Sequence, residues 1–286
     1  MSLEKNIQHI SVIGSGNMAH RLSYAFLSVG RTIDYIYSKT PEHAQDLLSY
    51  LRQYCSSSIA TACVEDLSPL LSSDLIIIAV SDKAITFIVK KLIDILEKDN
   101  LQNNTRNELP IIVHTSGATS ISVLSPLSRF NIHYGVLYPL MSLNKNRITD
   151  FTKVFFLLEG DDSDTEQELK ELIISIHSKY VFVTSEERLK MHVAAVFASN
   201  FTNYMLEMAY DVAGDYAKLL LPLTIETVEK AFQNTPEKMM TGPAIRKDFI
   251  TLEAHEKLLN RTGNQEALAL YRFITNNIIN KKNNTK

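Results

Sequence analysis

The residues best suited to do chemistry stand near the start of the chain, in the run Gly14-Ser15-Gly16-Asn17-Met18-Ala19. An apolar stretch precedes this Gly-x-Gly-x-x-Ala motif and an amphipathic one follows it, as when a strand leads directly into a helix. Gly14 permits a tight turn, Gly16 lets a pyrophosphate approach the backbone, and Ala19 lets the helix pack closely on the strand. The helix start also offers free N–H groups and a positive dipole end to phosphates. The motif therefore predicts a dinucleotide site, and the alternative is a tight turn with no ligand.

The end of the second strand indicates which dinucleotide is bound. NAD sites usually carry an acidic residue there, which binds the ribose 2′-hydroxyl. In this chain the strand 33–37 ends in Ser38-Lys39-Thr40, and Asp34 lies at the strand start, at the opposite edge of the sheet. Two hydroxyls and a cation suit a 2′-phosphate better, although the same residues could simply cap the next helix. We therefore expect the cofactor to be NADP(H).

Two later strand ends should lie at the same edge, because ligands of open α/β sheets bind at the carboxyl ends of the strands. One strand ends in Val80-Ser81, where we expect cofactor contacts, although Ser81 could instead cap the following helix. The other ends in Thr115-Ser116-Gly117, which is small enough to let a flat ring approach the backbone. His114 precedes this run, and we expect it to be a structural histidine rather than a general acid.

A long apolar helix expected over 186–213 carries the candidate catalytic residues. At about 100° per residue, His192, Ser199 and Asn203 share one stripe, with Asn200 beside it. Polar groups on an apolar helix are costly unless they have partners, so the stripe is either a hydrogen-bonded seam or the wall of a substrate pocket. In a pocket, His192 could protonate the substrate and Asn200 could bind the same group.

A third candidate follows a predicted turn at Gly242-Pro243. Pro243 can start a helix, which places Arg246 in the first turn, where a guanidinium could clamp a substrate carboxylate. Pairing of Arg246 with Asp248 is the alternative. No residue set predicts a metal site.

The order of elements predicts the fold that positions these residues. Apolar runs at 10–13, 33–37, 75–80 and 111–113 alternate with amphipathic stretches at 17–29, 41–54 and 82–97, which predicts βαβ units and a parallel sheet. Further strands are expected at 132–137, 153–158 and 180–183, with a helix at 164–178. Helices alone are expected afterwards, at 186–213, 222–232, 244–260 and 264–280. We therefore predict an α/β Rossmann-like NADP-binding domain over 1–184 and an all-α substrate and dimerisation domain over 185–286, with a loop at 99–108 and a frayed tail at 280–286.

Composition excludes several classes of protein. The chain has 286 residues, with 29 basic and 32 acidic residues and a net charge of −3, which argues against a nucleic-acid partner. Its apolar runs are too short to span a membrane, and no secretory leader is visible, so we expect a cytoplasmic protein. Cys55 and Cys63 make neither a zinc cage nor a disulfide framework.

These motifs together resemble known proteins. Gly14 to Ala19, Ser38-Lys39-Thr40 and Ala79-Val80-Ser81 resemble pyrroline-5-carboxylate reductase and the deazaflavin-dependent NADP oxidoreductases. The runs 114–118, 133–139, 192–200 and 241–248 are similar to an uncharacterised family that joins a Rossmann-like domain to a helical domain of unknown function. The wider superfamily includes 6-phosphogluconate and 3-hydroxyisobutyrate dehydrogenases, and this kinship implies a 6-phosphogluconate dehydrogenase C-terminal-like helical domain and a homodimer formed through it. The hydroxyacid dehydrogenases place a lysine and an asparagine where this chain carries His192 and Asn200, so their reaction does not transfer to it.

The function expected from the sequence is that of an NADP-dependent oxidoreductase. Acting as a reductase, it would transfer hydride from NADPH to a small carbonyl or imine substrate, for which a carboxylate-bearing compound is one candidate. The first alternative is a sensor or assembly module that binds NADP(H) without turnover. The second is hydride transfer from NADPH to a flavin or deazaflavin.

Overall fold

The computed structural model describes residues 7–54, 61–101 and 109–284. Cys55 and most of the expected loop at 99–108 lie outside these ranges. The chain divides into two compact units, Met1–Ser199 and Asn200–Lys286. All the strands of the described residues belong to the first unit, and the second is helical.

The first unit is built on an eight-stranded sheet with the order β3-β2-β1-β4-β5-β6-β7-β8. The strands are β1 (His9–Ile13), β2 (Thr32–Tyr37), β3 (Ala62–Val64), β4 (Leu75–Ile78), β5 (Ile111–His114), β6 (Tyr134–Pro139), β7 (Phe155–Gly160) and β8 (Lys179–Phe182). Neighbouring strands are parallel except β6 and β7, which pair antiparallel. The parallel sheet expected from the first four apolar runs is confirmed, and the antiparallel pair lies among the later strands. A parallel connection needs a crossover, usually a helix, and only the short 3₁₀ helix Phe151–Lys153 lies between these two strands.

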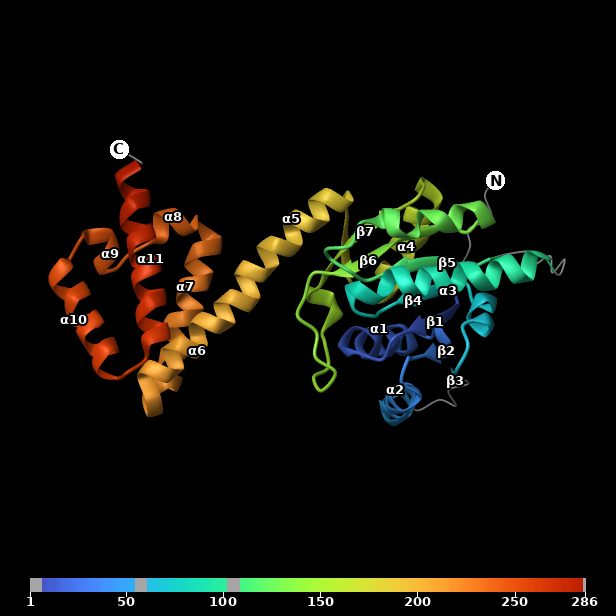
Figure 1. The fold of residues 1–286 in the computed structure, drawn as a ribbon, viewed down its shortest axis with the longest axis horizontal. Helices are drawn as coiled ribbons and strands as arrows, with labels where there is room; N and C mark the ends of the chain where they lie inside the picture. The colour runs from blue at the N-terminus through green and yellow to red at the C-terminus, as the bar shows by residue number, and fades with distance from the viewer. Residues whose placement is uncertain (1–6, 55–60, 102–108, 285–286) are drawn as a thin grey trace. The chain divides into compact units, whose positions relative to one another are not determined.

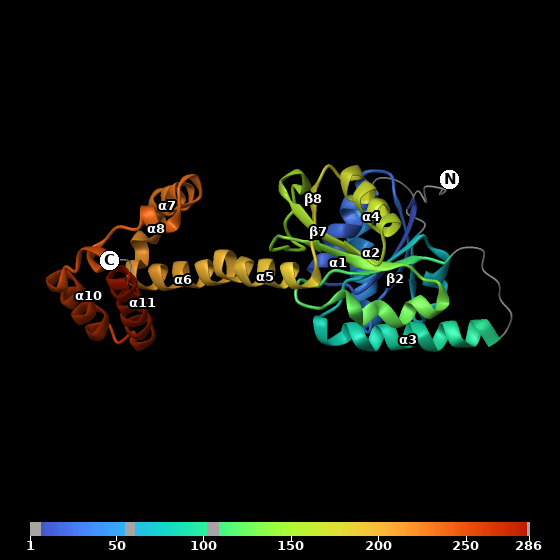
Figure 2. The same cartoon turned by 90° about the horizontal axis from the view of Figure 1, so that it is seen from above.

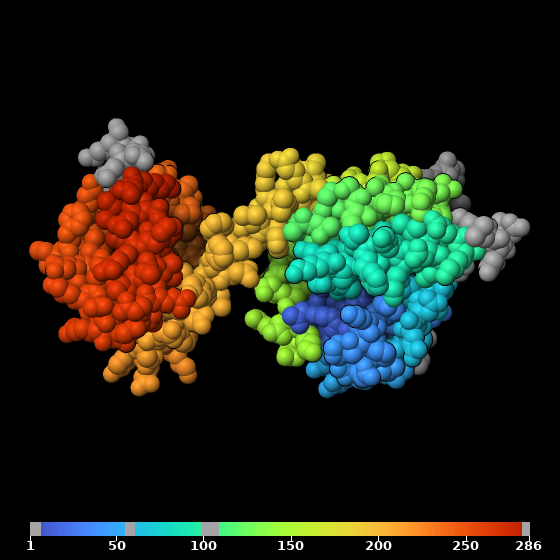
Figure 3. Space-filling model, in the orientation of Figure 1, coloured from blue at the N-terminus to red at the C-terminus, as the bar shows by residue number. Residues whose placement is uncertain are grey.

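Helices cover both faces of this sheet (Figures 1 and 2). One face carries α1 (Asn17–Ser28), α2 (Pro41–Tyr54) and α4 (Ser163–Ser175), and the other carries α3 (Asp82–Leu101) with the 3₁₀ helices Ser68–Ser72 and Ile121–Phe130. The helix α3 and the 3₁₀ helix Ile121–Phe130 lie side by side, as the teal and green bands of Figure 3 show. The Rossmann-like fold expected for this part of the chain is thereby confirmed.

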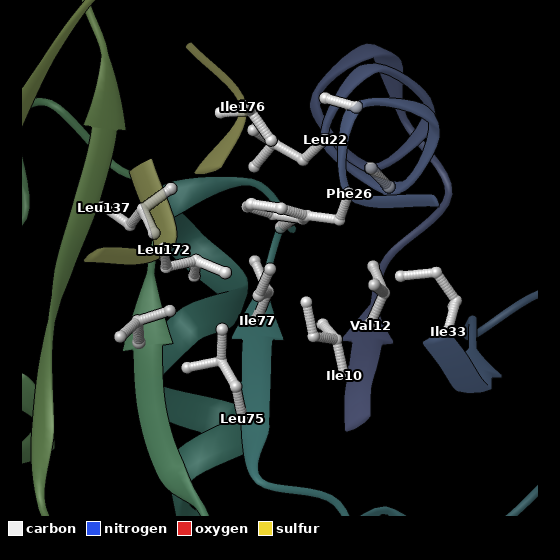
Figure 4. Packing of buried hydrophobic residues seen from close by; sticks show 14 of the residues in the cluster. Ile10, Val12, Leu22, Phe26, Ile33, Leu75, Ile77, Leu137, Leu172 and Ile176 are labelled. Atoms are coloured by element: carbon white, nitrogen blue, oxygen red, sulfur yellow. The ribbon is translucent and has the colours of Figure 1, made fainter. Parts of the chain in front are cut away.

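Alternating residues of each central strand bury themselves in two separate cores. In β4, Leu75 and Ile77 pack toward α1 and α4, as Figure 4 shows, whereas Ile76 and Ile78 pack toward α3. All four are fully buried. Successive side chains of a strand point to opposite faces, so a strand covered on both sides is apolar along nearly all of its length. This explains the unbroken apolar run that identifies β4 in the sequence.

The remaining elements are helical, as expected, but more broken than the sequence pattern predicts. They are α5 (Ser185–Ala195), a π-helical segment (Val196–Phe201), α6 (Thr202–Ala213), a 3₁₀ helix (Gly214–Leu220), α7 (Leu221–Gln233), α8 (Pro236–Met239), α9 (Pro243–Arg246), α10 (Phe249–Arg261) and α11 (Gln265–Asn284). The helix expected over 244–260 is interrupted because Lys247 adopts a left-handed conformation with φ of 56°. Two expectations at element ends were also wrong: α3 continues through Leu101 into the expected loop, and α11 continues through Asn284 into the expected tail.

The π-helical segment corrects the stripe expected on the helix 186–213. A π-helix has i→i+5 hydrogen bonds, so each residue turns the chain through less than the 100° of an α-helix. The periodicity that aligned His192, Ser199 and Asn203 therefore does not hold through residues 196–201. All six residues of the segment are at least partly exposed, so it is not a buried seam within either unit.

The start of the all-helical region and the division into units fall at different residues. Thr184 caps α5 in a capping box with Glu187, so the chain turns helical at the predicted boundary between 184 and 185. The division into compact units falls between Ser199 and Asn200. Buried Arg188 explains the difference, because it ties α5 to the sheet by pairing with Glu159.

Candidate functional site

A cavity of about 650 Å³ opens at the carboxyl ends of the central strands. It lies where the strand order reverses, between β1 and β4, which is the position at which open α/β sheets bind ligands. The ends of β1, β2 and β4 and the first half of α3 line it. The lining residues are Ile13, Gly14, Ser15, Gly16, Tyr37, Ser38, Lys39, Ala79, Val80, Ser81, Ala84, Phe87, Ile88 and Lys91. The structure thus brings together seven of the residues expected to bind the cofactor.

The two glycines of the motif are needed for different reasons. Gly14 has a φ of 119°, and a Cβ there would lie 2.3 Å from the carbonyl oxygen of Ala79, so the fold itself requires glycine. A Cβ on Gly16 would meet no protein atom within 4 Å. The protein's own packing therefore does not require the second glycine, whereas a ligand approaching the backbone would.

The helix α1 begins beside this glycine with free backbone donors. No side chain caps it at Gly16, and its first turn holds no acidic residue. The first N–H groups of a helix have no partner within the helix, so an uncapped start is suited to binding an anion.

The end of β2 forms the second wall of the cavity. The hydroxyl oxygens of Ser38 and Ser15 lie 3.0 Å apart, which joins the strand end to the glycine loop. Lys39 lines the cavity, and no acidic residue lies among the lining residues. Asp34 lies at the opposite edge of the sheet, where it contacts His9 at 3.1 Å. A cavity wall with hydroxyls, a cation and no carboxylate fits a ribose 2′-phosphate better than a free 2′-hydroxyl.

Sequence reasoning missed several side chains of this cavity, among them Tyr37, Phe87 and Lys91. Lys91 donates a hydrogen bond to the Tyr37 hydroxyl at 3.3 Å, and its Nζ lies 5.1 Å from the ring centroid of Phe87. Phe87 and Lys91 are four residues apart on α3, so they share a helix face. In this fold the helix after β4 lies beside the ligand site. That general rule could have pointed to Phe87 and Lys91 from the sequence alone.

Six residues expected to bind the cofactor do not line the cavity, and three of them adjoin the glycine loop or the end of β2. The Asn17 side chain accepts a hydrogen bond from the Lys145 backbone N–H at 3.0 Å. Met18 packs against the core. The Thr40 backbone carbonyl oxygen accepts from the His43 N–H at 3.1 Å at the start of α2.

Buried Arg21 of α1 was also missed, and it holds the segment between β6 and β7. Its guanidinium donates to the carbonyl oxygens of Lys145 at 2.7 Å and Arg147 at 2.9 Å, and it also bonds the Tyr50 hydroxyl. Together with Asn17, Arg21 docks this segment on the cofactor-facing helix.

The run Thr115-Ser116-Gly117 lies beside a second group of polar residues and not in the cavity wall. The Ser116 hydroxyl accepts from the Thr119 N–H at 2.9 Å and so shapes the turn. A Cβ on Gly117 would lie 2.7 Å from His192 Nδ1 and 2.8 Å from Tyr138 Cζ. Two side chains of the protein itself, rather than a ligand ring, occupy the space beside this glycine.

The group formed there is a hydrogen-bonded pair of Tyr138 and His192. The Tyr138 hydroxyl lies 3.0 Å from His192 Nδ1, and the two rings meet edge to face. Burial raises the pKa of Tyr138, and the Asp82 carboxylate raises it further. Asp82 is the residue next to Ser81, which lines the cavity. The effect of Asp82 on Tyr138 therefore shows that the Tyr138–His192 pair lies within electrostatic range of the cavity wall. A neutral tyrosine bonded to a histidine can hold and pass on a proton.

Arg188 positions His192 on α5. The two residues are four apart and so share a helix face. Arg188 pairs with Glu159 and donates to the Thr119 carbonyl at 2.6 Å, which fixes α5 against β7 and the turn after β5.

His114 is structural, as expected. It is fully buried, and its Nδ1 accepts the Ser116 N–H at 3.2 Å. Burial and the nearby Arg188 cation lower its pKa to about 4, so the ring is neutral near pH 7 and is not an acid poised for catalysis.

The two remaining candidates belong to the second unit. Asn200 and Arg246 are both exposed there. Arg246 is the last residue of α9 and not part of a longer helix. Asp248, the alternative partner of Arg246, caps α10 by accepting the Thr251 N–H at 3.1 Å.

One group within the described ranges has metal-like spacing, with ligand atoms of His133, Asp161 and Asp162 within 4.8 Å of one another. It lies at the opposite edge of the sheet from the cavity. Asp162 caps α4 through the Thr165 N–H at 2.8 Å, and His133 pairs with it at 3.1 Å, so helix capping and an ion pair explain the group. No helix of the described residues is long and apolar enough to cross a membrane.

The fold and the cavity define a class of proteins in which a Rossmann-like nucleotide domain precedes a helical region. Residues 9–102 match the family described as NADP oxidoreductase coenzyme F420-dependent, and residues 154–278 match a domain of unknown function, DUF2520. These matches confirm the resemblance expected from the motifs. No match was found among curated proteins.

Solved structures share this architecture. One is described as a "putative NADP oxidoreductase" from Bacteroides fragilis, with 28% identity, a TM-score of 0.79, and coverage of 96% of this chain and 98% of that one. Pyrroline-5-carboxylate reductase from Coxiella burnetii has 15% identity and a TM-score of 0.55, with 98% of both chains covered. Pyrroline carboxylate reductase from Plasmodium falciparum, solved with NADP bound, has 10% identity and a TM-score of 0.56, with 97% of this chain and all of that one (100%) covered. At such low identity, the two reductases show a shared fold only.

Proposed function

We propose that the protein is an NADP-dependent oxidoreductase that acts as a reductase on a small carbonyl or imine compound. The observation that carries the proposal is the cavity at the strand switch, in which an uncapped helix start, an unobstructed Gly16 and Lys39 meet without an acidic residue. The match of residues 9–102 to an NADP oxidoreductase family supports the same conclusion.

The chain's own residues would manage the proton in this reaction. Bound NADPH supplies a hydride to the substrate carbon, and the substrate oxygen or nitrogen must then take up a proton. The Tyr138 hydroxyl can donate that proton and recover one from His192 through their 3.0 Å contact. The phenol is protonated at neutral pH, as a donor must be, and burial raises its pKa further from that range. We also propose that Asn200 and Arg246 bind the substrate. The Asn200 amide would bind the reacting group, and the Arg246 guanidinium would bind a carboxylate.

Calorimetric titration of the purified protein with NADPH and with NADH is the first test. We expect NADPH to bind much more tightly, because a 2′-phosphate adds charge-assisted contacts that a hydroxyl lacks. Absence of binding by both nucleotides would contradict the proposal.

A turnover screen with NADPH then tests the catalytic pair. In the variants Tyr138→Phe and His192→Ala we expect turnover to fall by about 100-fold or more while NADPH affinity stays unchanged. Lys190→Met, an exposed change on the same helix, is the control. A protein that binds NADPH tightly and turns over no substrate would instead be the sensor or assembly module of the alternative.

Hydride transfer to a deazaflavin is the second candidate, favoured by the description of the matched family. It is tested by following NADPH oxidation with a deazaflavin as the only acceptor. Oxidation that survives Tyr138→Phe would favour this candidate over carbonyl reduction, because carbonyl reduction needs the proton donor.

We also propose that the protein is a homodimer formed through its second unit. Large apolar side chains are exposed there, including Tyr216 and Leu219 at 73% each, Phe232 at 83% and Ile250 at 85%. Apolar surface on this scale is typical of a protein interface. Sedimentation should give twice the mass of one chain, and the variant Phe232→Glu should shift it toward the monomer.

A further inference from the structure

We propose that Lys91 is a specificity-determining residue, a second cation that binds the 2′-phosphate of NADP(H) together with Lys39. This inference rests on the proposed function and deepens it. Nothing in the glycine motif or the strand ends points to Lys91, because it lies near the middle of α3.

Lys91 and Lys39 reach the same cavity from different elements. Lys39 follows the end of β2, whereas Lys91 approaches from the helix after β4, and both line the cavity. Lys91 is only partly exposed, and its Nζ donates to the Tyr37 hydroxyl at 3.3 Å. The Nζ also lies over two aromatic rings, 5.8 Å from the centroid of Tyr37 and 5.1 Å from that of Phe87. The ammonium is therefore held at the cavity wall rather than free to swing into solvent.

The charge balance of the cavity favours an anionic ligand group at this end. Two lysines line the cavity, and its lining includes no carboxylate. The hydrogen bond from the Ser68 hydroxyl is the main cause of the lowered pKa of Asp66, and the Lys91 charge lowers it a little further, so the two groups lie within electrostatic range. The Asp66 oxygens are already engaged, since they accept from the Leu67 N–H at 2.6 Å and the Ser68 hydroxyl at 2.8 Å. Lys91 is thus left facing the cavity with its charge.

A phosphate fits the remaining donors of Lys91. An ammonium has three N–H donors, and the contact with Tyr37 uses one of them. A 2′-phosphate carries close to two negative charges and several acceptor oxygens, more than one lysine can satisfy. The adenine ring is neutral and flat, so an aromatic ring is a better partner for it than the Lys91 cation. The Phe87 ring, which is 57% exposed on the same wall, can fill that role.

The test compares Lys91→Met with Lys90→Met, the matched change of an exposed neighbour on the same helix that does not line the cavity. Methionine keeps the apolar stem and removes the charge. Dissociation constants are measured by calorimetry for NADPH and NADH, and for adenosine 2′,5′-bisphosphate against AMP, which isolates the 2′-phosphate. We expect Lys91→Met to weaken the binding of NADPH and of the bisphosphate by about tenfold or more, since hydrogen bonds to charged groups are strong. The binding of NADH and of AMP should stay unchanged. Lys91→Arg should recover part of the loss, and Lys90→Met should bind as wild type does.

Each other outcome overturns the inference in a recognisable way. Equal losses for NADPH and NADH would assign Lys91 to the adenosine part that both share. Wild-type binding by Lys91→Met, with tight NADPH binding by the unmodified protein, would refute the role of Lys91 and leave the proposed function intact. A wild-type protein that binds neither nucleotide would overturn both.

Discussion

The hydroxyl of Tyr138 lies 3.0 Å from Nδ1 of His192, although the two residues are 54 positions apart in the sequence. Tyr138 belongs to the end of β6 and His192 to α5, so the contact forms only when that helix packs back on the sheet. Gly117, in the turn after β5, makes room for both rings. Three elements thus meet at one hydrogen bond, and this makes the pair sensitive to small changes around it.

Replacement of Gly117 by alanine should disrupt the pair. The new methyl group would lie 2.7 Å from His192 Nδ1 and 2.8 Å from Tyr138 Cζ, so at least one ring must move. We expect a stability loss of about 1–3 kcal/mol from overpacking, and a loss of turnover with NADPH affinity retained. Thermal unfolding and calorimetry measure these. In a His192→Ala background part of the clash disappears, so the cost of Gly117→Ala should be smaller there, and full additivity of the two changes would contradict the packing seen.

The two glycines of the nucleotide loop should respond differently to alanine. Gly14→Ala combines an unfavourable φ of 119° with a Cβ only 2.3 Å from a backbone oxygen, so we expect a loss of about 2 kcal/mol or more in unfolding free energy. Gly16→Ala meets no protein atom, so we expect near-wild-type stability but NADPH binding weakened by at least about tenfold, or about 1.4 kcal/mol. Denaturant unfolding and nucleotide titration separate the two effects. Retention of NADPH affinity in Gly16→Ala would argue against a pyrophosphate at this loop.

His114 should make folding stability depend on pH. Its pKa is lowered from 6.5 to about 4 in the folded state, so the unfolded chain binds a proton that the folded chain does not. This contribution is fully present above pH 6.5 and is lost as the pH falls toward about 4, at up to about 1.4 kcal/mol per pH unit. The variant His114→Gln, whose amide can still accept from the Ser116 N–H, should show a shallower decline over this range. Parallel stability curves for the two proteins would rule out a buried neutral His114.

The buried ion pair of Arg188 and Glu159 should dominate the anchoring of α5. Arg188→Met leaves the partly buried Glu159 carboxylate without its guanidinium, and we expect a loss of about 3–5 kcal/mol. Lys190→Met removes an exposed pair with Glu186 on the same helix and should change stability little. Chemical denaturation measures both. The double variant Arg188→Met with Glu159→Gln should be more stable than Arg188→Met alone, and equal stability would show that the unpaired charge is not the cause.

Most of the nucleotide site could be predicted from the sequence because its determinants are local. A strand, a Gly-x-Gly turn and a helix are adjacent in the chain, and the expected bounds of α2, 41–54, match the structure. The strand ends at Ser38 and Val80 fall in the cavity because parallel strands end at one edge of a sheet. Lys91 was missed because its role depends on which face of α3 turns toward β2, and the sequence pattern of that helix alone does not reveal a neighbouring strand.

The sequence alone determined the Rossmann-like order of elements, the glycine loop and the absence of an acidic residue at the end of β2, because each depends on residues close together in the chain. Tertiary structure decided the antiparallel pairing of β7 with β6 and the hydrogen bonds of Arg21 to the segment after β6. It also decided the contact of Tyr138 with His192 beside Gly117. It also replaced a regular helix by a π-helical segment over Val196–Phe201. These features depend on contacts between distant residues and on hydrogen-bond registers that differ little in local energy, so packing of the whole fold selects among them.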